Sequence, residues 1–186
     1  VVAVCEPDLG YPERWSVTRW IEGEAPPVVT ATARRADRRG LAQDLADVIE
    51  QLRSIEVPTH AARDASLRWY RGQPLRELDA QFRQSVEACR DLADLDLDLD
   101  AALRVWADAV AVAPIDTGAT PRWYHGDLLA ENLLARDGRL VAVLDFGGLA
   151  VGDPTVDLIV AWEVLDVAGR DTFRRALAVD DVTWLG

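Results

Sequence analysis

The sequence has no methionine and no lysine, so all 20 of its basic residues are arginine. Its two cysteines, Cys5 and Cys89, lie 84 positions apart and form no CxxC pair. This spacing excludes a disulfide framework and a typical zinc motif, and it favours a reducing, cytoplasmic setting. There is no run of 18 apolar residues and no signal-peptide pattern at the first residue. We therefore expect no membrane partner.

The chain opens on Val1 rather than on methionine. The apolar run at 1–4 is typical of the middle of a strand, so we expect the sequence to be a piece of a longer chain. An upstream targeting segment is then not excluded. The same reasoning places any required lysine upstream of Val1.

The length of 186 residues, with 49% hydrophobic and 28% charged residues, is typical of a globular protein with a sizeable core. The formal net charge is −12. Such an acidic chain repels phosphate backbones, which argues against a nucleic-acid partner. The charge suits a cationic ligand, but solubility is the more common reason for such a charge. The sequence leaves the oligomeric state open.

Two short strands and several helices are predicted along the chain. The run at 1–4 and the alternation over 15–21 favour strands. Apolar residues spaced by three or four predict helices over 37–55, 75–92 and 100–112, whereas 60–74 has no regular pattern. The helical pattern returns after Asp153. The residues expected to face inward are Leu41, Leu45, Val48, Leu52, Ile55, Leu78, Phe82, Val86, Cys89, Leu103, Trp106, Val110 and Trp162. This order predicts an α+β fold with segregated elements.

A β-hairpin is predicted around Asp137-Gly138, because both positions of a two-residue hairpin turn need positive φ. Pairing residue 136 with 139 places Asn132 opposite Val143, and Asp145 lies two residues further on. Asp127 precedes Asn132 by five residues. Three oxygen-bearing side chains therefore converge at the open end of the hairpin. Oxygen ligands without sulfur favour magnesium, a hard ion that is commonly shared with phosphates.

The segment His125-Gly126-Asp127-Leu128 with Asn132, followed by Asp145-Phe146-Gly147, matches the two linked motifs of the kinase signature. Protein kinases usually carry arginine at Gly126 and lysine at Leu129. The His-Gly-Asp form instead resembles the aminoglycoside phosphotransferase family, as does Gly152-Asp153-Pro154 with Asp157. The resemblance extends loosely over nearly the whole chain, including 67–72, and is most specific over 123–158.

The resemblance implies a protein-kinase-like fold. Residues 1–23 would form the end of the N-terminal lobe and the hinge, and 24–186 would form a mainly helical C-terminal lobe containing the catalytic hairpin. It further implies ATP- and Mg²⁺-dependent transfer of a phosphoryl group to a hydroxyl of a small molecule, with an aminoglycoside among the candidate acceptors. The backbone of Arg19 and Ile21 would meet adenine at the hinge.

Particular roles in the site follow from the same resemblance. Asp127 would be the general base or would orient the acceptor hydroxyl. Asn132 and Asp145 would hold magnesium on the phosphates. His125 and Asp157 would brace the loop, and Asp153 would cap a helix that begins at Pro154. Glu131 has no fixed role in the family and is taken as an exposed charge. His60 is taken as a surface residue.

Two parts of such an enzyme are missing from this sequence: a glycine-rich phosphate loop and a lysine. We therefore expect the chain by itself to bind ATP poorly and to be inactive. Two alternatives stay open. One is a kinase-like binding module that lacks catalysis, which an upstream sequence without lysine would favour. The other is a metal-dependent phosphohydrolase, which would need more metal ligands than the sequence offers.

Overall fold

The computed structural model describes residues 1–29, 37–92, 95–112 and 121–185. It is an α+β structure, as predicted. Its helices and strands, in chain order, are β1 (Ala3–Cys5), β2 (Trp15–Val17), α1 (Arg39–Ser54), α2 (Thr59–Arg63), α3 (Leu75–Cys89), α4 (Leu99–Val112), β3 (Arg122–Tyr124), β4 (Leu133–Arg136), β5 (Arg139–Val143), β6 (Ala150–Gly152), α5 (Val160–Val164), α6 (Val167–Ala176) and α7 (Asp181–Leu185).

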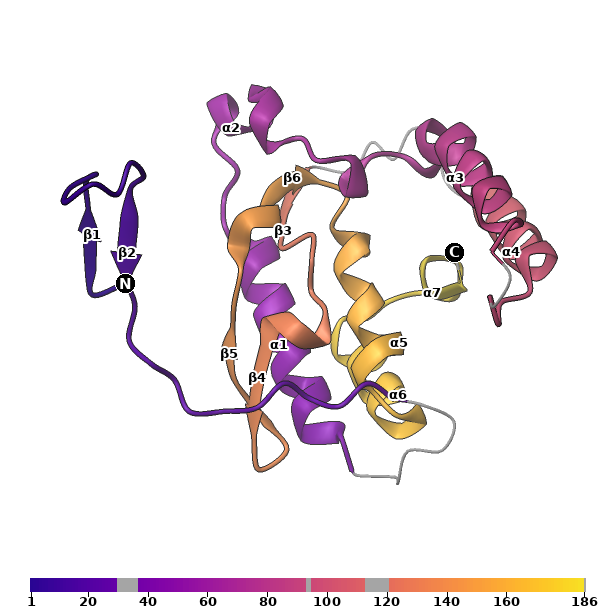
Figure 1. Ribbon diagram of the computed structural model, residues 1–186. Coiled ribbons are helices and arrows are strands. Elements are labelled where there is room, and N and C mark those ends of the chain that lie inside the picture. The colour runs from indigo at the N-terminus through magenta and orange to yellow at the C-terminus, as the bar shows by residue number, and fades with distance from the viewer. Residues whose placement is uncertain (30–36, 93–94, 113–120, 186) are drawn as a thin grey trace.

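Helix α1 lies at the centre of the main body. It packs against α6 on one side and against β3 and β5 on the other (Figure 1). Its buried face consists of Leu41, Ala42, Leu45, Ala46 and Ile49, which recur at helical spacing. The prediction that Ile55 faces inward is wrong: the helix ends at Ser54, and Ile55 is 53% exposed beyond it. The core is completed by Phe173 and by apolar residues of α5 and the hairpin.

This core gives a first testable prediction. Leu45 is fully buried in the middle of α1. Leu45→Ala leaves a cavity and is expected to lower the free energy of unfolding of the complete protein by about 3 kcal/mol. Glu50→Ala, on the exposed face of the same helix, should change it by less than about 0.5 kcal/mol. Urea unfolding measures both values, and equal losses in the two variants would contradict this packing.

The hairpin β4–β5 turns at Asp137 and Gly138, both of which have positive φ, as predicted. Arg136 pairs with Arg139, but the register shifts between Leu134 and Ala135, so Leu133 pairs with Val143. The predicted opposition of Asn132 and Val143 is therefore wrong by one residue. The bulge leaves Asn132 beside Leu144, whose N–H donates to the Asn132 carbonyl at 2.8 Å.

Asp44 joins helix α1 to the hairpin. Its carboxylate accepts two hydrogen bonds from the Arg139 guanidinium, at 2.6 and 2.7 Å, and one from the Leu140 N–H at 3.0 Å. The bonds from Arg139 are the largest cause that lowers the pKa of Asp44 below its usual value. A carboxylate with a lowered pKa in the folded state stabilises the fold above its unfolded pKa, and this contribution is lost as pH falls through the lowered value.

Asp44→Asn is accordingly expected to cost about 1 kcal/mol at pH 7, and its difference from the wild type should shrink towards zero as the pH falls through the lowered pKa of Asp44. Asp47→Asn, one turn away on the exposed side of α1, is the matched control. Urea unfolding as a function of pH gives both curves. A penalty for Asp44→Asn that stayed constant down to the lowest pH would contradict a role for the ionised carboxylate.

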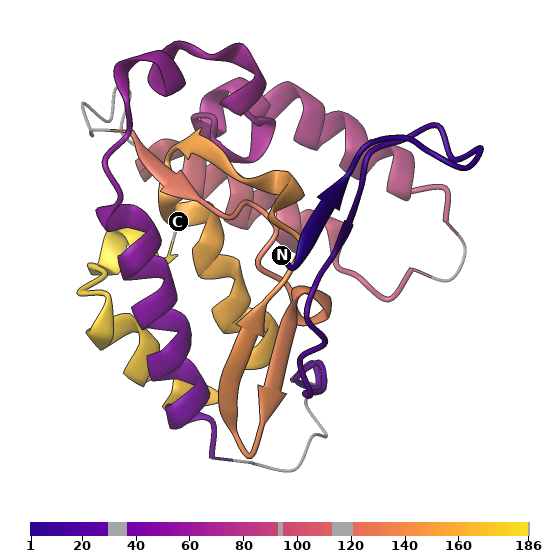
Figure 2. The same ribbon diagram turned by 90° about the vertical axis from the view of Figure 1, so that its left-hand side faces the viewer.

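The N-terminal hairpin β1–β2 pairs Ala3 with Val17 and stands apart from the main body (Figures 1 and 2). The prediction of a strand through Ile21 is wrong, because β2 ends at Val17. The chain then runs in an extended connection to Glu24, which forms an antiparallel bridge with Ala135 of β4. Gly23 permits a close approach here, since a Cβ at this position would lie 3.0 Å from side-chain atoms of both Leu134 and Val141. The connection therefore crosses the hairpin at close range.

Helices α3 and α4 pack on each other at one side of the molecule (Figure 1). Trp106 stacks on Phe82 with ring centroids 4.2 Å apart, and its indole N–H donates to Asp79 at 2.7 Å. Trp106 is half-buried rather than part of the main core. Of the residues of α3 expected inside, Val86 is buried and Cys89 is partly exposed.

Three further predictions need correction. Residues 60–74 were expected to be irregular, but they contain most of α2 and two 3₁₀ turns, Ala65–Leu67 and Tyr70–Gly72. The helical stretch after Asp153 is broken into a 3₁₀ segment (Pro154–Ile159), α5 and α6. Trp162 was expected in the core but is 45% exposed and stacks against Trp184.

None of the described helices is long and apolar enough to span a membrane.

Candidate active site

Strands β3 and β6 bring the two sequence motifs together. β3 leads into His125-Gly126-Asp127 and β6 follows Asp145-Phe146-Gly147, and the pair is antiparallel with Tyr124 opposite Ala150. Gly126 has a φ of +81°, and a Cβ at this position would lie 2.6 Å from the Gly148 carbonyl oxygen. The close approach of the two loops therefore requires glycine at 126.

Asp157 fixes the backbone of the loop His125-Gly126-Asp127. It is 1% exposed, and its two carboxylate oxygens accept the N–H groups of His125 and Gly126, both at 2.8 Å. Burial raises the pKa of Asp157, whereas these two hydrogen bonds act in the opposite direction. Arg53 supplies a nearby positive charge, and burial lowers the pKa of that guanidinium. Asp157 thus holds the loop through its backbone.

His125 connects the two motifs. Its ring is buried, and Nε2 lies 2.9 Å from the Leu144 carbonyl oxygen, while Nδ1 accepts the Asp127 N–H at 3.2 Å. These contacts assign the proton to Nε2, which donates to Leu144. The ring also packs on Phe146, with centroids 4.7 Å apart. His125 therefore connects Leu144, the residue before Asp145, to Asp127, the candidate base.

Asp127 and Asn132 contact each other directly. The Asn132 Nδ2 group donates to the Asp127 carbonyl at 2.8 Å and to the Asp127 Oδ2 at 3.2 Å. Asn132 is 7% exposed, and Glu163 supports the 3₁₀ turn Ala130–Asn132 by accepting the Ala130 N–H at 2.7 Å. The Asn132 Nδ2 group thus has both of its partners on Asp127, and among the described residues no hydrogen bond is donated to the side-chain oxygen of Asn132.

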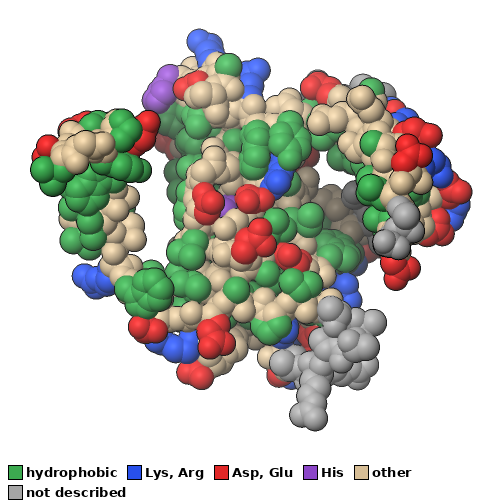
Figure 3. All heavy atoms as spheres, viewed as in Figure 1, with side chains coloured by type: hydrophobic (Ala, Val, Ile, Leu, Met, Phe, Trp, Pro, Cys, Tyr) green, Lys and Arg blue, Asp and Glu red, His purple; other side chains and the backbone are tan. Residues whose placement is uncertain are grey.

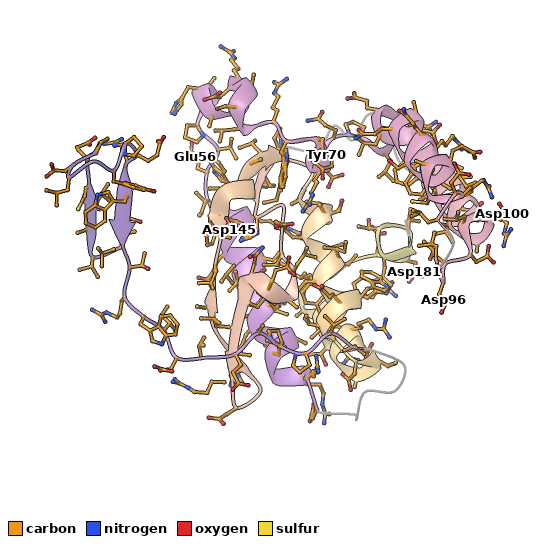
Figure 4. The ribbon with its side chains drawn as sticks, in the orientation of Figure 1. Glu56, Tyr70, Asp96, Asp100, Asp145 and Asp181 are labelled. Atoms are coloured by element: carbon orange, nitrogen blue, oxygen red, sulfur yellow. The ribbon has the colours of Figure 1, made fainter. Side chains whose placement is uncertain are left out.

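Asp145 lies beyond the end of β5, at the open end of the hairpin and exposed to solvent (Figure 4). It adopts the left-handed conformation with a φ of 53°, and its Oδ1 accepts the Gly147 N–H at 3.1 Å. Positive φ is uncommon for a residue other than glycine and often marks a functional position. The Leu144 N–H bond to Asn132 holds the two metal-ligand candidates at the same end of the hairpin.

This donor set fits a magnesium ion that takes most of its ligands from phosphates and water. Within the described ranges there is no group of three or more His, Cys, Asp or Glu side chains suited to a metal. One carboxylate and one amide oxygen are what Mg²⁺ commonly uses in nucleotide-dependent sites. Asn132 and Asp145 are the residues that would hold it.

The remaining predicted site residues lie as follows. Asp153 accepts the Thr155 N–H at 2.9 Å and caps the 3₁₀ segment that begins at Pro154. Arg19 and Ile21 are exposed and lie in the connection between β2 and the bridge at Glu24. This connection approaches the β4–β5 hairpin at Gly23. Glu131 and His60 are exposed.

Sequence reasoning missed Arg71, which forms an ion pair with Asp127. The segment containing it matched the family only loosely, and no periodic pattern links residue 71 to residue 127. It also missed Glu163, which lies in α5 next to the exposed Trp162. Both side chains contact residues that are far away in sequence, and local sequence patterns do not predict such contacts.

The fold around His125, Asp127, Asn132 and Asp145 is that of a protein-kinase-like lobe. The chain belongs to the phosphotransferase enzyme family (APH), whose family model matches residues 1–184. Among curated proteins, no sequence matches the chain.

Solved structures with the same fold include aminoglycoside and macrolide phosphotransferases. The GDP and kanamycin complex of APH(2'')-IIIa is 22% identical, with a TM-score of 0.60, and the match covers 99% of this chain and 61% of that chain. The streptomycin and ATP complex of APH(2'')-IIa is 18% identical, with a TM-score of 0.55, and the match covers 89% of this chain and 57% of that chain. A macrolide 2'-phosphotransferase from Brachybacterium faecium is 22% identical, with a TM-score of 0.51, and the match covers 86% of this chain and 52% of that chain. This chain therefore spans between 52% and 61% of these relatives.

Proposed function

We propose that the complete protein transfers the γ-phosphoryl group of ATP, with Mg²⁺, to a hydroxyl group of a small molecule. The observation that carries the proposal is the direct contact of Asp127 with Asn132 at the open end of the hairpin, where Leu144, the residue before Asp145, donates its N–H to the Asn132 carbonyl. Membership of the phosphotransferase family supports it.

In this proposal Asp127 accepts the proton of the acceptor hydroxyl or orients that hydroxyl. The acceptor oxygen forms a bond to the γ-phosphorus, and the bond between that phosphorus and the oxygen of the departing ADP breaks. Mg²⁺ bound by Asn132 and Asp145 would neutralise charge on the phosphates. Most of the acceleration in such a reaction comes from positioning and charge neutralisation, which a loop fixed by Asp157 and His125 supplies.

The acidic charge of the chain supports a cationic acceptor. The chain carries 32 acidic and 20 basic residues. Acidic side chains gather in the middle of the face shown in Figure 3, and again over the pair α3 and α4. A hydroxyl compound with several ammonium groups, such as an aminoglycoside, is attracted to such a surface. Relatives of the same fold were solved with kanamycin and with gentamicin.

The test uses the complete protein, including whatever precedes Val1, because this chain contains no lysine and no glycine-rich phosphate loop. Nucleotide consumption is followed with ATP or GTP, with and without Mg²⁺, across aminoglycosides, macrolides and simple neutral or anionic alcohols. Acceptor-stimulated, Mg²⁺-dependent consumption supports the proposal. Stimulation by neutral alcohols but not by aminoglycosides would overturn the acceptor class. Nucleotide binding without turnover for any acceptor would favour a kinase-like binding module.

A further inference from the structure

The segment Trp69–Gly72 lies directly on the catalytic loop, although the two are separated by more than 50 residues in sequence. Tyr124 donates a hydrogen bond to the Trp69 carbonyl at 3.3 Å, and the Gly72 carbonyl accepts the Asp153 N–H at 3.3 Å. Two glycines permit this approach. A Cβ on Gly72 would lie 2.3 Å from the Tyr124 hydroxyl, and one on Gly148 would lie 2.5 Å from the Trp69 ring.

Arg71 projects from this segment to the candidate base. Its Nη1 donates to the Gly126 carbonyl at 2.8 Å and also pairs with the Asp127 Oδ1. The guanidinium itself is held in place: it lies 4.6 Å from the centroid of the Trp69 ring, and its Nε donates to the Tyr70 hydroxyl at 3.0 Å. Arg71 and Asp127 are both about one-third exposed or less, at 31% and 28%. The pair is thus anchored rather than a free surface contact.

The two oxygens of Asp127 have different partners. Oδ1 pairs with Arg71 and Oδ2 accepts from Asn132. A carboxylate held at both oxygens has a fixed plane and a fixed direction for its remaining lone pairs. Leu129, two residues after Asp127, stands where protein kinases usually carry a lysine and supplies no charge. The positive charge next to the base comes from Arg71 instead.

We propose that Arg71 is a positioning residue that fixes the Asp127 carboxylate for the acceptor hydroxyl. The proposal rests on the proposed function. It differs from a role in binding the acceptor, because a positioning residue acts on the rate of the chemical step and leaves ground-state binding nearly unchanged.

The experiment measures kcat and KM of the complete protein for both nucleotide and acceptor. Arg71→Ala is expected to lower kcat by about 10²-fold, with both KM values changed by less than about threefold. Arg71→Lys keeps the charge but loses the planar fork, so it should recover part of the loss. Arg68→Ala is the matched control, since Arg68 is exposed on the same segment and contacts only the Ala62 carbonyl among the described residues. It should behave as the wild type.

A double variant separates positioning from other roles. With Asp127→Asn already present, Arg71→Ala should lower the rate little further, because it acts through Asp127. A thermal unfolding scan of each variant shows whether it is folded. If Arg71→Ala does not fold, the kinetics of Arg71→Lys test the positioning role instead. A raised acceptor KM at unchanged kcat, or a full additional loss in the Asp127→Asn background, would overturn the positioning role. If the wild type transfers no phosphoryl group, the proposed function fails; if it does and Arg71→Ala is fully active, only the role of Arg71 fails.

Discussion

Asp127→Asn in the complete protein is expected to lower kcat for phosphoryl transfer by roughly 10³-fold. The amide keeps the shape of the side chain and can keep the contact with Asn132, but it cannot accept a proton and it no longer pairs with the Arg71 charge. Nucleotide affinity should stay close to that of the wild type, because Asn132 and Asp145 remain. Steady-state kinetics and a nucleotide-binding titration measure the two quantities.

Glu131→Gln is the matched control for this variant. It removes the same charge four residues away, on a side chain that is exposed and has no assigned role. We expect its kcat to lie within about twofold of the wild type. An Asp127→Asn protein with undiminished kcat, or an equal loss in both variants, would show that Asp127 has no special part in the chemistry.

Asp157→Asn is expected to lower the free energy of unfolding by about 3 kcal/mol, about as much as Leu45→Ala in the core. Both carboxylate oxygens of Asp157 accept backbone N–H groups, so an amide places an N–H donor against one of them. The Arg53 charge also loses the nearby carboxylate that acts on its pKa. Because the loop is no longer held, turnover should fall as well. Urea unfolding and kinetics of the complete protein give both values.

The control for Asp157→Asn is Asp153→Asn, the same substitution four residues earlier. Asp153 caps the 3₁₀ segment through one oxygen that accepts the Thr155 N–H. Asparagine caps about as well as aspartate, so the change in unfolding free energy should stay below about 0.5 kcal/mol. A stable, fully active Asp157→Asn protein would contradict the assignment of Asp157 as the support of the loop.

Local features of this fold could be predicted because each rests on a short pattern. The Asp137-Gly138 turn follows from the need for positive φ at both positions, and α1 follows from the apolar spacing of Leu41 and Leu45. The bulge in β4–β5 could not be predicted, because no residue type in the hairpin requires it. It shifted the partner of Asn132 by one residue, and Leu144, the residue before Asp145, still donates its N–H to the Asn132 carbonyl.

The contacts in the site that join distant parts of the chain could not be predicted from the sequence. The contacts of Arg71 with Asp127 and of Glu163 with Ala130 join residues that are 56 and 33 positions apart. Trp162 has helical spacing but faces Trp184 at the surface, because α5 buries Val160, Ala161 and Val164 and Trp162 lies on the other side of that helix. For Asp157, only the family resemblance indicated a role; its two hydrogen bonds to backbone N–H groups give the physical reason for one.

The most direct test of the account follows the γ-phosphoryl group itself. The complete protein is incubated with Mg²⁺, ATP labelled in the γ-phosphate and the acceptor that best stimulates consumption, and the label is located by mass spectrometry. The account predicts that the acceptor gains one phosphoryl group on a hydroxyl oxygen, and that Asp127→Asn abolishes this product. Label released only as inorganic phosphate, at a rate independent of the acceptor, would contradict it and would indicate a metal-dependent phosphohydrolase.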